Sequence, residues 1–298
     1  MSLRRGLSVG AIAAVCAAGA IAMSGCGASN TIDPVAQAAT MSNQSPGMRM
    51  LFSVRLSAAA LSAPITATGG GKFDTADRRG SFNLAMDFGS FPQVVQALGS
   101  STLGIQEILD DTTVYLKVPP RLAGAMGLGG KPWGKVDLAS VASAAGIPGL
   151  STLASNPTSS DPSQLLRYLR ATSRGVTTIG SASVDGFQTT HYRAQIQLDR
   201  VPDVFPPASR SQARQTISAL ERLTHVHALP VDVWIDGQHL VRRMQLSLNE
   251  NIAGQPLSTT MRIDIPEYGA QAPPQPPPAS QVTNLTGRVG TSAASASG

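Results

Sequence analysis

The chain of 298 residues contains little cysteine, few aromatic residues and little charge: two cysteines, 4% aromatic residues and 14% charged residues. Two cysteines exclude a disulfide scaffold and a cysteine-rich zinc site. The formal net charge of +5 is modest and no dense run of lysine and arginine concentrates it, so nucleic acid is not an expected partner. The hydrophobic fraction of 42% is too high for a disordered protein and sufficient for a large folded core.

The N-terminal segment has the order of features found in secretory signals. Two arginines precede an apolar run over residues 7–23, and small residues follow it. This order predicts a signal peptide over residues 1–25. The tetrapeptide Met-Ser-Gly-Cys that ends at Cys26 resembles the bacterial lipobox, which implies cleavage before Cys26 and a diacylglyceryl group on its thiol. An ordinary secretion signal that contains a cysteine is the alternative.

A lipidated Cys26 would fix the location of the protein. Two acyl chains give stable membrane anchoring, where a single chain gives only marginal binding. Residues 26–32 would then form a lipidated tether, and the folded part would begin at residue 33. We therefore expect a protein that is lipid-anchored on the extracytoplasmic face of the cell membrane.

From Gly47 onward, apolar and polar residues alternate with the period of two that is typical of β-strands. Turn-forming pairs at residues 110–111, 185–186 and 236–237 separate these runs. The pattern contains about ten strands joined in sequential hairpins, with helices inserted between them. Because strands and helices do not alternate regularly, a parallel nucleotide-binding sheet is not expected. The pattern predicts an α+β fold with a curved antiparallel sheet.

Three segments carry helical signals. Asp33 is a natural N-cap for a helix that begins at Pro34. The pair at residues 161–162, again Asp-Pro, predicts the start of a second helix. Residues 208–224 have the clearest amphipathic pattern, with leucine and isoleucine along one side.

Two other segments lack strong signals for regular structure. The stretch 119–163 is rich in glycine, proline, serine and alanine, and it predicts a loop with one weak helix near residues 138–145. Such a loop would suit a flexible lip through which a ligand enters. The composition of residues 269–298 predicts a disordered tail rich in proline, alanine and serine.

One face of the predicted sheet is apolar and the other is polar. The apolar face needs cover, which either helices or a ligand can provide. For every residue on this face, plain core packing is the alternative to ligand contact; methionines there can adapt to chains of variable shape. The candidate lining residues of a cavity are Leu84, Met86, Val114, Leu116, Tyr192, Ile196, Val233, Ile235, Met244, Leu246, Met261 and Ile263. The opposite face carries Lys117, His191, Arg193, Asp232, Arg243 and Asp264.

Catalytic and metal-binding patterns are scarce. His225 and His227 have the spacing of two ligands on one strand face, but no third ligand accompanies them, which favours solvated side chains. No nucleophile, general base and oxyanion site can be combined from the predicted elements. We therefore expect no enzyme activity, no metal site and no cofactor.

Several segments occur in an order found in a known family. They are the lipobox, DPVAQAA from Asp33, TVYLKVP from Thr113, KPWGKVDL from Lys131, DGFQTTHYR from Asp185 and LPVDVWIDG from Leu229. Together they resemble the LolA-like lipoproteins of actinobacteria, the group that includes the LppX and LprG lipid carriers. The resemblance implies an incomplete antiparallel barrel, or half-barrel, over residues 33–268, with helices across its concave face and a hydrophobic cavity. It implies no catalytic residues.

The resemblance also implies a function: a membrane-anchored carrier that binds the acyl chains of a lipid or lipoglycan and moves it through the envelope. Each methylene that leaves water for such a cavity gains about 0.8 kcal/mol, so an aliphatic lining is sufficient. A membrane transporter is a further candidate partner, and a monomer is expected. The alternative is a non-enzymatic envelope lipoprotein with a filled core that binds a protein partner or senses the state of the envelope. An apolar cavity of about 300–1,000 Å³ would favour the carrier.

Overall fold

The computed structural model describes residues 33–59, 61–140, 164–171, 175–224, 226–252 and 255–288. The predicted signal peptide and tether, with Cys26, lie outside these residues. So do His225 and most of the helix expected near residues 138–145.

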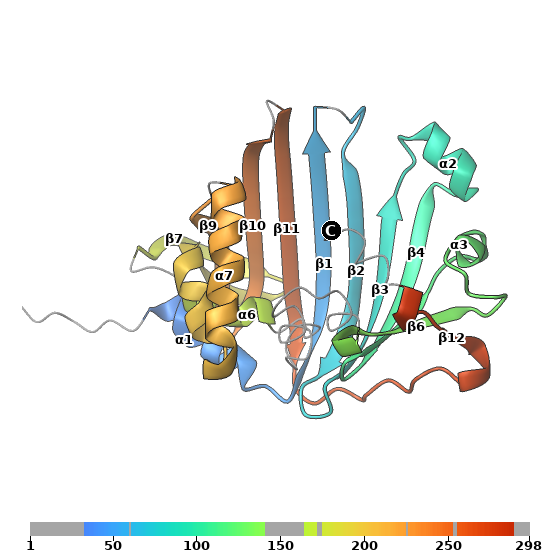
Figure 1. Cartoon of the computed structure of the whole chain (residues 1–298). Coiled ribbons are helices and arrows are strands. Elements are labelled where there is room, and N and C mark those ends of the chain that lie inside the picture. The colour runs from blue at the N-terminus through green and yellow to red at the C-terminus, as the bar shows by residue number, and fades with distance from the viewer. Residues whose placement is uncertain are drawn as a thin grey trace, which may run out of the picture. The chain divides into compact units, whose positions relative to one another are not determined.

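The described residues contain twelve strands in one sheet. They are β1 (Gly47–Ala58), β2 (Ile65–Asp74), β3 (Arg79–Asp87), β4 (Thr102–Asp110), β5 (Thr113–Lys117), β6 (Trp133–Asp137), β7 (Thr177–Val184), β8 (Phe187–Gln197), β9 (Ala228–Asp236), β10 (Val241–Ile252), β11 (Gln255–Tyr268) and β12 (Val282–Asn284). Their order across the sheet is β12-β6-β5-β4-β3-β2-β1-β11-β10-β9-β8-β7 (Figure 1). The edge strands β7 and β12 do not pair with each other, so the sheet stays open. The expected α+β fold with an incomplete antiparallel barrel is confirmed, with twelve strands rather than about ten.

Two antiparallel meanders make up the sheet. Strands β1 to β6 are neighbours in sequence order, and so are β7 to β11. The pairing of β1 with β11, from Met48 opposite Tyr268 to Ala58 opposite Leu257, joins the two meanders. This junction lies between strands that are far apart in sequence. Strand β12 runs parallel to its neighbour β6.

The helical segments are α1 (Pro34–Asn43), α2 (Pro92–Leu98), α3 (Pro120–Ala125), α6 (Gln164–Tyr168), α7 (Pro207–Thr224), and the 3₁₀ turns η1 (Leu169–Ala171), η2 (Leu198–Val204) and η3 (Ala279–Gln281). As predicted, α1 follows the N-cap Asp33, whose carboxylate accepts hydrogen bonds from the N–H groups of Val35 at 2.8 Å and Ala36 at 3.2 Å. The predicted helix over 208–224 is also confirmed, as α7. Helix α1 packs against α6 and η1, and α7 packs against η2. Figure 1 shows these helices grouped beside β9 and β10.

The predicted hairpin turns differ in how closely the structure follows them. Asp185 and Gly186 have φ values of 49° and 86°, the left-handed values that a two-residue hairpin turn requires, and they join β7 to β8 as expected. The connection after β9 is longer than the predicted pair at 236–237. There the Asp236 carboxylate accepts hydrogen bonds from the N–H groups of Gln238 and Leu240, at 2.8 and 3.0 Å. This side chain therefore organises the turn.

The stretch 119–163, predicted as a loop, begins with regular structure, so that prediction is wrong for its first part. Helix α3 and strand β6 lie within it, and β6 pairs with β5 so that Val136 lies opposite Val114. The alternation in β6 spans only five residues among glycines and prolines, which is too short for a clear period. Pairing with β5 decides its structure, as is usual for strands of weak intrinsic preference. Residues 141–163 lie outside the described part.

The C-terminal segment also differs from the predicted disordered tail, over residues 269–288. It runs from the end of β11 to the far edge of the sheet, where it forms β12 (Figure 1). Leu285 is 4% exposed and packs in a small cluster with Leu128 and Val136. One leucine and a three-residue strand make this attachment, and such short signals do not change an average composition.

The two faces of the sheet differ as the alternation predicts. The inner face is the face that packs against the helices. Cross-strand partners from β8 to β1 form its central row, Tyr192, Val233, Met244, Ile263 and Phe52. The neighbouring row on the outer face of β8 to β11 is His191, Trp234, Arg243 and Asp264. The main core lies between the inner face and the helices, because it includes buried residues of α1, α6 and η2 together with those of β8 to β11.

Candidate functional site

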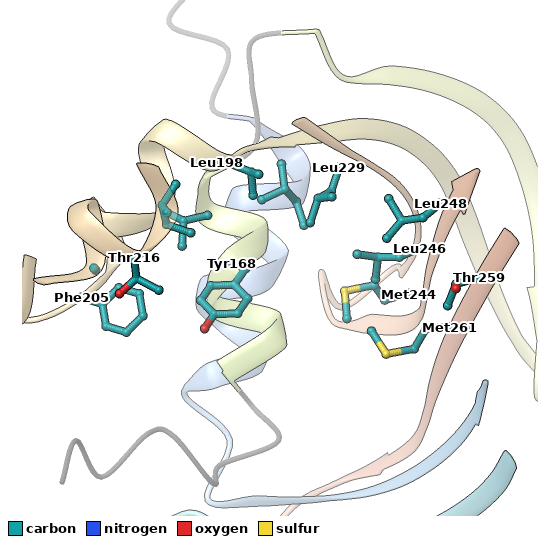
Figure 2. A pocket seen from close by; sticks show the side chains of 14 residues that line it. Tyr168, Leu198, Phe205, Thr216, Leu229, Met244, Leu246, Leu248, Thr259 and Met261 are labelled. Atoms are coloured by element: carbon teal, nitrogen blue, oxygen red, sulfur yellow. The ribbon is translucent and has the colours of Figure 1, made fainter. Parts of the chain in front are cut away.

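A cavity of about 460 Å³ lies between the helical segments and the inner face of β8 to β11. Figure 2 shows the strand side chains on one side of it and the helix side chains on the other. Its volume falls within the range of pockets that bind small ligands, about 300–1,000 Å³. The lining residues are Tyr168, Ile196, Leu198, Val201, Phe205, Ala213, Thr216, Ile217, Leu229, Met244, Leu246, Leu248, Thr259 and Met261.

The strand side of the cavity is built by cross-strand pairs. Leu246 on β10 lies directly opposite Met261 on β11, and Ile196 on β8 lies opposite Leu229 on β9. Met244 stands two residues before Leu246 and therefore points to the same face. Direct partners on one face have Cβ atoms about 5 Å apart, so these side chains form a continuous apolar surface across four strands.

The helix side comes from three segments: α7, α6, and η2 with the adjoining Phe205. In α7, Ala213 stands three residues before Thr216 and four before Ile217, a spacing that places all three on one side of the helix. Tyr168 is the last residue of α6, and its ring packs against the ring of Phe205 with the centroids 6.2 Å apart. The helix side of the cavity is therefore held in place by contacts between elements that are distant in sequence.

The lining contains no charged side chain. Its polar side-chain groups are three hydroxyls, those of Tyr168, Thr216 and Thr259. Burial raises the pKa of the Tyr168 phenol above its ordinary value, against a smaller opposing effect of Arg167, so the phenol stays protonated at neutral pH. Such a lining can hold hydrocarbon through the hydrophobic effect and can orient a single polar group.

The structure separates the twelve predicted lining residues into three groups. Four of them line the cavity: Ile196, Met244, Leu246 and Met261. Four others lie on the inner face of the same strands but outside the lining: Tyr192, Val233, Ile235 and Ile263. The last four lie on β3 and β5, in the other half of the sheet: Leu84, Met86, Val114 and Leu116.

Sequence reasoning missed the helix side of the cavity. Tyr168 and Phe205 carry no local signal that would identify them as lining residues. The amphipathic pattern of α7 identifies the side that includes Ile217 as the packed side, but it does not indicate which strands that side faces. On the strand side, Leu248 extends the alternation of Met244 and Leu246 along β10, so alternation predicts the face to which it belongs.

A second hollow, of about 770 Å³, lies on the outer face over residues 69–71 of β2. Its rim includes the charged residues Arg49, Lys72 and Glu267. Leu84, one of the predicted cavity residues, also borders this hollow. Charged side chains on the rim make it a poor site for hydrocarbon, because a chain bound there would displace water from them.

Of the three histidines that the structure describes, His191 and His227 have side-chain partners. The ring of His191 hydrogen-bonds the Asp232 carboxylate at 2.8 Å and stacks on the indole of Trp234, with centroids 4.2 Å apart. His227 lies 3.3 Å from the carboxylate of Glu221. Among the described residues, no cluster of three or more histidine, cysteine, aspartate or glutamate side chains has a geometry that could hold a metal ion. None of the helices described combines the length and the hydropathy needed to cross a bilayer.

No protein-family model and no curated protein sequence matches the chain. Among solved structures, the chain is similar to LprF from Mycobacterium bovis, with 12% identity, a TM-score of 0.44, and coverage of 82% of this chain and 96% of that chain. It is also similar to the lipoprotein LppX from Mycobacterium tuberculosis, with 11% identity, a TM-score of 0.42, and coverage of 80% and 94%.

Proposed function

We propose that this protein is a carrier that holds the acyl chains of a lipid or lipoglycan in the cavity and moves the lipid through the cell envelope. The observation that supports the proposal most directly is a cavity of about 460 Å³ whose lining has no charged side chain. Each acyl methylene that enters gains about 0.8 kcal/mol. Several buried methylenes are therefore needed to offset the loss of translational freedom and the ordering of the chain.

The two methionines of the lining suit a ligand of variable shape. Met244 and Met261 come from neighbouring strands, and their unbranched thioether side chains can change rotamer without leaving the apolar surface. A carrier must release its cargo as well as bind it. A lining that adapts to the chain, rather than one that fits a single shape, favours that exchange.

The inner face of β1 to β5, beyond the cavity strands, is proposed as a continuation of the lipid path. Cross-strand pairing runs from Ile263 through Phe52 and Gly69 to Leu84, so one face continues from the cavity strands to β3. A lipid with more than one acyl chain would need this additional surface. On this basis, the proposal includes the four predicted residues on β3 and β5, which are Leu84, Met86, Val114 and Leu116.

The proposed location is the extracytoplasmic face of the cell membrane, with Cys26 carrying the lipid anchor. The support is the order of a charged segment, an apolar run and a lipobox-like tetrapeptide in the sequence. Metabolic labelling with a radioactive fatty acid tests this, because a Cys26→Ser chain should not incorporate the label. We propose no catalytic step and no cofactor, a monomeric carrier, and a membrane transporter as a candidate partner.

The alternative, a lipoprotein with a filled core that binds a protein, predicts that side chains fill the space between the helices and the sheet. Much of the inner face is filled in this way, since Val233 and Val241 are fully buried. The space beside Leu246 and Met261 is not filled by the described side chains. That difference favours the carrier.

Lipid that co-purifies with the protein tests the proposal. The mature chain, secreted without its anchor from residue 27 to residue 298, must keep its C-terminal segment because Leu285 is buried in the small cluster. Native mass spectrometry of this protein should show a stoichiometric adduct that organic solvent releases as acylated lipid. A protein that carries no lipid and takes none up from phospholipid vesicles would contradict the proposal.

A further inference from the structure

Three hydroxyl groups interrupt the apolar lining of the cavity. They belong to Tyr168 at the end of α6, Thr216 on α7 and Thr259 on β11. Within the part of the chain that the structure describes, none of the three makes a hydrogen bond to protein. A polar group that faces an apolar space is satisfied only when a ligand or a water molecule supplies a partner.

Tyr168 is held at the cavity by its neighbours. Its neighbours Leu166 and Leu169 are 2% and 0% exposed, so α6 and η1 are anchored in the core on both sides of it. The ring of Phe205 packs against the Tyr168 ring and limits its rotation. Figure 2 shows Tyr168 among the lining side chains, with Phe205 and Thr216 on one side of it. The phenol is therefore a polar group held in one place.

The electrostatic character of the lining limits what the phenol can bind. Because burial raises its pKa, the Tyr168 hydroxyl stays protonated and can donate a hydrogen bond at neutral pH. A carboxylate or phosphate that entered would lose its hydration without a cation in the lining, and the effect of the nearby Arg167 on the phenol is smaller than that of burial. A neutral acceptor, by contrast, gains the hydrogen bond without the cost of burying a charge.

We propose that Tyr168 donates a hydrogen bond to an ester carbonyl of the bound lipid, so that the cavity selects neutral ester-linked lipids over free fatty acids and plain hydrocarbon. The proposal rests on the proposed function, since it concerns the same cavity. It makes Tyr168 a specificity-determining residue, while the aliphatic lining supplies most of the affinity. Thr216 and Thr259 are secondary hydrogen-bond donors for the remaining polar atoms of the lipid.

Competition binding to the mature chain tests this. The neutral fluorophore N-phenyl-1-naphthylamine is displaced by four competitors of one chain length: the methyl ester, the primary alcohol, the carboxylate and the alkane. The ester should bind roughly fivefold more tightly than the alkane, the fold-change expected for one hydrogen bond, and the carboxylate should bind least well. Tyr168→Phe should bring the ratio of ester to alkane affinity close to one and leave the alkane affinity unchanged.

Tyr115→Phe is the matched control. It removes the same hydroxyl from β5, where Tyr115 alternates with Val114 and Leu116 and therefore lies on the outer face, and it should preserve the ratio of ester to alkane affinity. A second measurement needs no variant: the infrared carbonyl band of a ¹³C-labelled ester should shift to lower frequency when the ester binds the wild-type protein. An unshifted band, or an unchanged affinity ratio in Tyr168→Phe, would overturn the role of Tyr168.

The remaining outcomes are equally decisive. If the alcohol binds more tightly than the ester and loses that advantage in Tyr168→Phe, the phenol recognises a hydroxyl and the ester assignment is wrong. If Tyr168→Phe weakens alkane and ester equally, Tyr168 contributes packing alone and the proposal fails. A wild-type protein that binds neither the fluorophore nor any competitor would overturn the proposed function itself, and this inference with it.

Discussion

Leu246 on β10 and Met261 on β11 are direct cross-strand partners, and both side chains line the cavity between the sheet and α7. Across the cavity, α7 contributes Ala213, the smallest side chain in the lining. The space therefore lies between a surface of long aliphatic side chains and a helix face with a small residue in it. This arrangement gives a simple way to fill the cavity from the helix side.

Replacing Ala213 with phenylalanine should reduce lipid binding. Ala213 is 3% exposed and borders the cavity, so the added ring has to occupy that space. We expect about tenfold weaker displacement of N-phenyl-1-naphthylamine by a methyl ester, equivalent to about 1.4 kcal/mol of binding free energy. Overpacking should cost about 1–3 kcal/mol of folding stability. Ala208→Phe, at an exposed position of the same helix, should bind as the wild type does; undiminished binding by Ala213→Phe would place the lipid elsewhere.

Replacing Glu107 with glutamine should stabilise the fold at neutral pH. Glu107 lies on the inner face of β4, opposite Phe82 on β3 and Leu116 on β5, and burial raises the pKa of its carboxyl. The folded state therefore holds this proton more tightly than the unfolded state does, so the carboxyl lowers stability as the pH rises from the ordinary glutamate pKa to the raised one. Thermal unfolding should give a higher Tm for Glu107→Gln than for the wild type above that pKa.

The difference should disappear below about pH 3, more than one unit under the ordinary glutamate pKa of about 4.3, because the carboxyl is then protonated in both states. Glu267→Gln provides the control, since Glu267 is exposed on the outer face and its removal should leave Tm nearly unchanged at either pH. Equal Tm values for Glu107→Gln and the wild type at neutral pH would show that the carboxyl is well solvated in the folded protein.

Removing one partner of the buried Arg242–Asp236 ion pair should be costly. Arg242 Nε lies 2.6 Å from Asp236 Oδ2, and each side chain is 6% exposed. The Cζ atom of Arg242 also lies 3.7 Å from the centroid of the Phe187 ring. Arg242→Met leaves a buried carboxylate without its cation and should lower the free energy of unfolding by about 3–5 kcal/mol in urea denaturation. Arg214→Met, which breaks the exposed pair with Asp203, should cost at most about 1 kcal/mol. Similar losses in the two variants would contradict a buried pair.

Truncating Leu285 should loosen the far edge of the sheet. Its side chain is 4% exposed and packs against Leu128 and the backbone at Gly134. Leu285→Ala should cost about 2–5 kcal/mol of unfolding free energy, as for other buried leucines. Proteolysis of the folded protein should then be faster within residues 269–288. Gln281→Ala, at an exposed position of the same segment, should behave as the wild type does, and equal proteolysis rates would indicate that β12 is not attached to the sheet.

The sequence predicts most of the fold because its signals are local. The N-cap at Asp33 and the turn at residues 185–186 specify backbone conformation over a few residues, and both were predicted. Alternation predicts which residues share the inner face, because side-chain direction in a strand depends only on position. Strands β6 and β12 are not predicted, because each is short and depends on a pairing partner: β6 pairs with β5, and β12 pairs with β6, which is distant in sequence.

The candidate site was less predictable, for a physical reason. Alternation places Met261 and Val233 on the same face, yet Met261 borders the cavity while Val233 is fully buried in the core. What separates them is the position of the helices over the sheet. That position is set by contacts between distant elements, such as the packing of Tyr168 on Phe205. No periodicity within one element carries that information.

Lipid transfer between vesicles tests the central claim most directly. Donor vesicles of phosphatidylcholine would contain a fluorescent diacylglycerol, and acceptor vesicles would contain phosphatidylcholine alone. The mature chain should accelerate transfer in proportion to its concentration, and Ala213→Phe should lose most of that acceleration because its cavity is filled. Transfer at the spontaneous rate in the presence of the wild-type protein would contradict the account.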